Sequence, residues 1–191
     1  MYLKETFFLW SISILLNQDG LALPKGTRVA VRFDKFEWFV NQMFGQTKEI
    51  NIKRNGGADL VDIFLTFDFD FIIQKVSLEV IMCKEHYIDC VNYRSFEVAN
   101  FCENDKTISY FAKIGYSNQK MSCTFQKGPY IFKNSTINLD TITKSFALNS
   151  DKWWEKTWKF RVDYYFNITL LAMRHYGDVQ ILLLSNRTRR Y

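Results

Sequence analysis

Residues 62–71, DIFLTFDFDF, alternate apolar and polar side chains with a period of two. One phase holds only apolar residues, namely Ile63, Leu65, Phe67, Phe69 and Phe71. The other phase carries three aspartates, Asp62, Asp68 and Asp70. Because an unpaired carboxylate is costly to bury, this pattern predicts a half-buried β-strand whose apolar phase faces a core and whose aspartates face water.

The same alternation recurs along the chain. It predicts strands at 29–33 and 76–82, with further strands near 50–53, 109–113, 121–125, 130–138, 158–165 and 179–184. Turns are expected at 55–57, 127–129 and 176–178, and short helical turns at 93–100 or 36–43. Many short strands with turns at such spacing predict an all-β fold, a single antiparallel β-sandwich or cup.

The N-terminus has the features of a secretory signal peptide. Lys4 precedes ten largely apolar residues, 7–16 (FFLWSISILL), and Gly20-Leu21-Ala22 fits a small-residue cleavage site. Ten residues make about 15 Å of helix, which is too short to span a membrane, although a buried N-terminal helix is an alternative. We therefore expect a signal peptide at 1–22 and one domain at 23–191, or 191 − 22 = 169 residues.

The cysteines and glycosylation motifs agree with secretion to the extracellular space. The chain has four cysteines, Cys83, Cys90, Cys102 and Cys123. In a secreted protein an even set predicts two disulfides, with three possible pairings. Three N-glycosylation motifs begin at Asn134, Asn167 and Asn186.

No pattern of catalytic residues is found. His86 and His175 are the two histidines, and neither lies in a metalloprotease or nucleophile-elbow motif. Cys83, His86 and Cys90 lack the usual spacing of zinc ligands. No glycine-rich phosphate loop is present, and the net charge of +5 is spread along the chain rather than gathered on a basic helix. The sequence thus predicts a protein that is not an enzyme, with no metal or cofactor and no nucleic-acid partner.

Aromatic residues are abundant, and three tryptophans, Trp153, Trp154 and Trp158, lie within six residues. Polar residues flank Trp153 and Trp154 on both sides, and tryptophan suits boundaries that are apolar on one side and wet on the other. We therefore expect both rings, half-exposed, at the mouth of an apolar pocket, although one ring could instead close the end of the sandwich. Either a filled core or a pocket between splayed sheets would use the aromatic residues.

Two segments resemble motifs of the ML-type lipid-recognition family, which contains the ganglioside activator protein. Residues 123–130 (CTFQKGPY) resemble its Cys-Pro-Phe-x-x-Gly-x-Tyr motif, and 154–162 (WEKTWKFRV) resemble its Trp-Leu-x-x-Gly-x-Tyr-Arg-Ile motif. The six-residue gap between Cys83 and Cys90 also fits. The likeness is greatest to the insect chemosensory branch called CheB, with its relative CheA.

This resemblance implies the pairing Cys83–Cys90 with Cys102–Cys123 and a β-cup that holds a hydrophobic ligand. Phe67, Phe69, Phe71, Trp153, Trp154 and Trp158 would then line the cup or its rim. The implied function is a secreted, non-enzymatic carrier of pheromone-like lipids or hydrocarbons in contact chemosensation, with possible contact to a membrane surface or receptor. The alternatives are an extracellular interaction module with a filled core and a hydrolase cofactor that extracts lipids from membranes.

Overall fold

The computed structural model describes residues 27–54, 58–100, 102, 112–120, 122–139 and 153–185. Within these ranges the chain forms antiparallel sheets with two short 3-10 turns, η1 (Glu85–Tyr87) and η3 (Trp153–Glu155). The prediction of an all-β antiparallel sandwich is confirmed. The expected signal peptide at 1–22, the turn at 55–57 and Asn186 lie outside the described residues.

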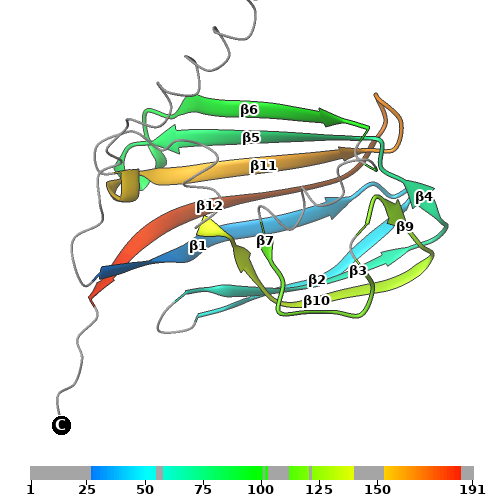
Figure 1. Ribbon diagram of the computed structural model, residues 1–191, viewed down its shortest axis with the longest axis horizontal. Coiled ribbons are helices and arrows are strands. Elements are labelled where there is room, and N and C mark those ends of the chain that lie inside the picture. The colour runs from blue at the N-terminus through cyan, green and yellow to red at the C-terminus, as the bar shows by residue number, and fades with distance from the viewer. Residues whose placement is uncertain are drawn as a thin grey trace, which may run out of the picture.

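The larger sheet joins the start and the end of the described chain. Its order is β1 (Thr27–Val40), β12 (Leu171–Ser185), β11 (Thr157–Tyr165), β5 (Lys75–Cys83) and β6 (Val91–Ala99). β12 pairs with β1 on one side and with β11 on the other, so the C-terminal strand lies inside the sheet. Figure 1 shows these strands from β6 at the top to β1.

The second sheet follows the order β2 (Gly45–Lys53), β3 (Leu60–Phe67), β10 (Gly128–Ile137) and β7 (Ala112–Lys113), and its strands β2, β3 and β10 lie below β1 in Figure 1. β8 (Tyr116–Ser117) also pairs with β10. A separate short pair, β4 (Phe71–Ile72) with β9 (Thr124–Phe125), lies at one end of the sandwich. Of the strand predicted at 109–113, the described part is β7.

The prediction of a helical turn at 36–43 is wrong, because β1 continues to Val40. A register shift between Phe33 and Lys35 inserts Asp34 as an extra residue. Such a bulge reverses the phase of the strand, so the inward side chains pass from Phe33 to Phe36. The resulting three-residue spacing imitates the period of a helix.

The turn predicted at 176–178 is also absent, because β12 runs through it. Gly177 is instead required by close packing. A Cβ atom at Gly177 would lie 2.8 Å from Cε1 of Phe160 and 2.9 Å from the carbonyl oxygen of Lys35. Glycine here marks the close approach of a neighbouring ring and strand rather than a turn.

The helical turn expected at 93–100 is likewise wrong, because β6 occupies Val91–Ala99 and pairs with β5. Most β6 side chains are exposed. A largely exposed edge strand carries little hydrophobic alternation, so its sequence has a weak strand signal.

The predicted inward and outward faces of residues 62–71 are correct within the strand and wrong at Asp62 and Phe69. Ile63, Leu65, Phe67 and Phe71 are buried, whereas Phe69 is 42% exposed because β3 ends at Phe67. Asp62, predicted to face water, is buried. Its carboxylate accepts hydrogen bonds from the backbone N–H of Asn134 at 2.9 Å and from Lys53 at 2.5 Å, so its burial is compensated.

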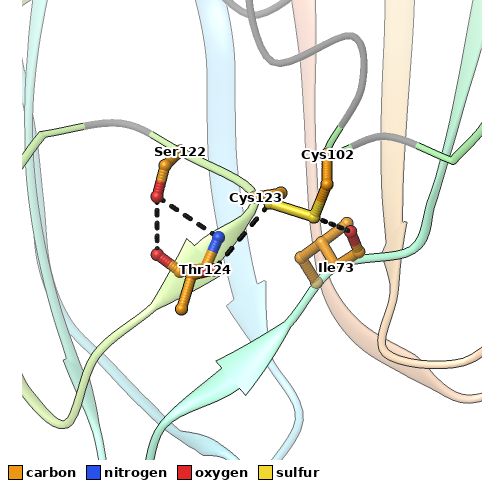
Figure 2. The surroundings of a disulfide bond; sticks show 5 residues. All are labelled: Ile73, Cys102, Ser122, Cys123 and Thr124. Carbon is orange, nitrogen blue, oxygen red and sulfur yellow. Dashed lines mark hydrogen bonds between the residues drawn. A yellow bond between two sulfur atoms is a disulfide. The ribbon is translucent and has the colours of Figure 1, made fainter.

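Both disulfides follow the pairing that the family resemblance implies, Cys83–Cys90 and Cys102–Cys123. The first closes the connection between β5 and β6. The second fastens the segment after β6 to the start of β9, beside Ile73 (Figure 2). The backbone N–H of Ile73 donates to the carbonyl oxygen of Cys123 at 2.8 Å, which joins the β4 and β9 segments next to the bridge.

Candidate functional site: an apolar pocket between the sheets

A pocket of about 280 Å³ lies between the two sheets. The wall from the larger sheet includes Val76, Leu78 and Val80 of β5, together with side chains of β1, β6, β11 and β12. The opposite wall includes Val61 and Ile63 of β3 and residues of β10. Period-two alternation on both sheets turns these apolar side chains toward each other.

The centre of the larger-sheet wall is a stack of rings around His175 of β12. Trp38 of β1 is its paired residue across the strands, and the two ring centres lie 4.4 Å apart. The ring centres of Phe36 and Phe160 each lie 5.9 Å from the centre of the imidazole, and that of Tyr164 lies 5.6 Å from it. Offset and tilted ring pairs at these distances are favourable contacts.

Burial lowers the pKa of His175 to about 3, and the nearby Asp163 carboxylate opposes this shift only in part. The ring retains some accessible area because it faces the pocket, yet protein surrounds it closely enough to disfavour its charged form. His175 is therefore a neutral ring at physiological pH, with one N–H donor and one acceptor nitrogen in either tautomer.

Sequence reasoning missed His175 and Trp38 as pocket residues. On β12, His175 shares its phase with Met173 and Val179, both buried, so the alternation that would have found it is present. The turn predicted at Gly177 interrupted that pattern. Trp38 was missed because the bulge in β1 shifted its phase.

The tryptophans divide between the pocket and its edge. Trp153 and Trp158 are buried and line the pocket, and the Trp158 indole N–H donates to the carbonyl oxygen of Trp153 at 3.1 Å. Trp154 is half-buried and its ring meets that of Trp153 edge-on. The expectation of two half-exposed rings is therefore wrong for Trp153, which is 7% exposed. Trp153 closes this part of the sandwich, which is the alternative weighed from the sequence.

Phe67, Phe69 and Phe71 do not line the pocket. Phe67 and Phe71 belong instead to a filled region near β4 and β9, here called the aromatic end. It consists of Phe44, Phe67, Phe71, Phe125, Tyr130 and Phe166, with neighbouring ring centres 4.9–5.5 Å apart. The Tyr130 hydroxyl accepts a hydrogen bond from the backbone N–H of Gln126 at 2.7 Å, so its buried polar atom is paired.

The buried carboxylates of Asp62 and Asp163 are paired and do not line the pocket. Asp163 is held by Arg174 through two hydrogen bonds of 2.5 and 2.9 Å. Burial would raise the pKa of Asp62, but Lys53 and the Asn134 N–H together hold that pKa below its usual value. Neither aspartate is among the pocket-lining residues, so we assign both a structural role.

Other predicted sites have simple surroundings. Asn134 and Asn167 are exposed, Asn134 at the bulge of β10 and Asn167 between β11 and β12. Among the described residues, no group of three or more His, Cys, Asp or Glu side chains could hold a metal ion. Within the same ranges, no helix is long and apolar enough to cross a membrane.

Comparison of the chain with protein-family models found no match, and comparison with curated proteins found none either.

Proposed function

We propose that this protein is a secreted, non-enzymatic carrier of a small lipid or another hydrophobic molecule. The observation that carries the proposal is the pocket of about 280 Å³, whose lining is mostly apolar and aromatic. Burial of apolar surface gains about 25 cal/mol per Å², so such a pocket would retain a poorly soluble ligand without any covalent step. The volume lies near the lower limit of small-molecule sites, which favours a ligand with a single chain.

Two further observations bear on secretion and on the family resemblance that this proposal adopts. Two disulfides within one small domain suit an oxidising compartment. The CTFQKGPY motif at 123–130 forms the link from β9 to β10. Under this proposal the chain is an ML-type lipid-recognition protein similar to the insect chemosensory branch, and its ligand is a pheromone-like lipid or a hydrocarbon.

A second candidate is an interaction module that contacts a receptor or a membrane surface. Four exposed apolar side chains favour it: Met43, Phe69, Ile72 and Ile168. They lie on the connections β1–β2, β3–β4 and β11–β12 and on β4 itself. We call these four residues the apolar tip. Phe69 contacts Phe44 and Phe71, so the apolar tip is continuous with the aromatic end.

The test is binding of a fluorescent naphthylamine probe to the secreted protein, with native mass spectrometry to detect co-purified lipid. Val80→Trp places a bulky ring in the pocket and is expected to reduce probe binding at least about tenfold. Val91→Trp is the matched control, because Val91 lies on the adjacent strand, is 54% exposed and does not line the pocket. It is expected to bind as the wild type does.

Equal binding by both variants, or no binding by the wild type, would overturn the carrier proposal. The interaction module would then be favoured, and the apolar tip would be tested next. Transfer of lipid from vesicles to a hydrolase, without stable retention of that lipid, would instead support the cofactor alternative.

A further inference from the structure

Residues that line the apolar pocket carry a small set of buried hydrogen-bonding atoms that have no partner. In the described part of the chain, six buried side-chain nitrogen or oxygen atoms lack a hydrogen bond. Four of the six belong to residues that line the pocket: Trp38, Ser135, Thr136 and His175. Buried polar groups are normally paired, so this concentration in one cavity needs an explanation.

The four atoms form two patches on opposite walls. Nδ1 of His175 and Nε1 of Trp38 lie on the paired strands β12 and β1 of the larger sheet. Oγ of Ser135 and Oγ1 of Thr136 lie on β10 of the second sheet, next to its register shift. Both residues line the pocket.

The chemistry of the first patch favours a neutral oxygen. The Trp38 indole is a donor only, and the His175 imidazole has one donor and one acceptor, so together they match a hydroxyl or carbonyl group. The low pKa of His175 means that this patch supplies no positive charge. Of the pocket-lining residues, Lys159 carries an ammonium group, which lies 5.3 Å from the centre of the Tyr87 ring. A carboxylate ligand would therefore be buried without a cation on the His175 patch, which is costly.

We propose that the ligand is a neutral, single-chain oxygenated compound, such as a fatty alcohol or ketone, whose oxygen is bound by His175 and Trp38. This inference rests on the proposed carrier function and narrows its ligand class. It disfavours pure hydrocarbons, which would leave all four polar atoms unpaired, and fatty-acid anions, which would lack a counter-charge at this patch. Because these nitrogen and oxygen atoms are shielded in the structure, binding of the ligand oxygen requires the side chains that carry them to rotate toward the pocket.

The experiment compares dodecanol, dodecane and dodecanoate as displacers of the naphthylamine probe. His175→Phe keeps an aromatic ring of similar size and removes both nitrogens. It is expected to weaken dodecanol binding about tenfold, which is the effect of losing one hydrogen bond of typical net strength, and to change dodecane binding by less than about twofold. Wild-type protein is expected to bind dodecanol more tightly than dodecanoate.

Two further variants keep the test decisive. Phe160→Leu trims an apolar ring beside His175 and is expected to weaken dodecanol and dodecane equally. Trp38→Phe removes the indole donor of the same patch and serves as an independent test if His175→Phe fails to fold. In that test too, a selective loss of dodecanol binding supports the proposal.

Equal losses of dodecanol and dodecane binding in the variants that remove polar atoms would overturn the inference and leave the carrier function intact. Tighter binding of dodecanoate than of dodecanol by the wild type would overturn it as well. Failure of all three compounds to displace a bound probe would also overturn the inference, whereas failure of the probe itself to bind would overturn the carrier proposal.

Discussion

The aromatic end and the pocket are built by the same two sheets, yet one is filled and the other is open. At the aromatic end the β4–β9 pair and the Cys102–Cys123 bridge close the sandwich, and three rings pack edge to face around Phe67. At the pocket the β5 wall carries smaller side chains, such as Val76, Leu78 and Val80, and the sheets leave a cavity. The comparison teaches that aromatic content does not distinguish a filled core from a pocket. The difference comes from the short strands β4 and β9, which close the sandwich at the aromatic end.

The largest expected effect separates a packed ring from a pocket ring. Phe67→Ala removes a fully buried side chain in contact with Phe71, Phe125 and Tyr130 and should lower the free energy of unfolding by about 3–5 kcal/mol. Phe96→Ala makes the same substitution in a pocket-lining residue that is 39% exposed and should cost less than about 1 kcal/mol. Urea denaturation measures both values, and similar losses would show that the pocket is packed as tightly as the aromatic end.

A second difference concerns the two tryptophans beside the pocket. Trp153→Ala should lower the free energy of unfolding by about 3 kcal/mol, because the buried ring is lost next to Trp158. Trp154→Ala should cost about 1 kcal/mol or less, since that ring is half-buried at the edge. Thermal midpoints of both variants check this order. A larger loss for Trp154 would place that residue, and not Trp153, as the closing ring.

Removing each disulfide in turn measures how much the stability of the fold depends on that covalent link. Cys102 and Cys123 are 21 residues apart, whereas Cys83 and Cys90 are 7 apart. By the chain-entropy relation, replacing Cys102 and Cys123 with serines should lower the free energy of unfolding by about 3.4 kcal/mol, and replacing Cys83 and Cys90 should lower it by about 2.5 kcal/mol. Denaturation of the two double variants gives the comparison. If loss of Cys83–Cys90 proved more damaging, the connection between β5 and β6 would matter more to folding than closure of the aromatic end.

The last expected effect is a pH dependence that arises from His175 in the pocket. The pKa of His175 is about 3 in the folded protein and 6.5 in an unfolded chain, so between these values the unfolded state binds the extra proton. The free energy of unfolding should therefore fall as the pH decreases from about 6.5 toward 3, and His175→Phe should remove this part of the slope. His86→Gln is the control, because His86 is exposed and does not line the pocket. An unchanged slope in His175→Phe would show that the imidazole is more hydrated than its surroundings indicate.

Local alternation predicted most of the strands correctly because each needs only its own residues to show which face is apolar. Ile63, Leu65 and Phe67 are buried as that rule requires. The rule failed where contacts from another strand decide whether a residue is buried. Asp62 is buried because Lys53 and the Asn134 N–H come from neighbouring strands to pair it, and Gly177 looked like a turn because its reason for being glycine is the Phe160 ring of another strand.

The sequence by itself determined that this chain forms antiparallel strands with one apolar face, because a period-two pattern is a property of consecutive residues. Its motifs, through their family resemblance, also indicated which cysteines pair. Only the tertiary structure decided which apolar residues fill the core and which line a pocket, because that depends on where β4 and β9 close the sheets. It alone brought His175 against Trp38, since they are 137 positions apart in sequence and meet through the pairing of β1 with β12. Whether a buried polar atom has a hydrogen-bond partner depends on its neighbours in space, and those neighbours are set by the register of the paired strands.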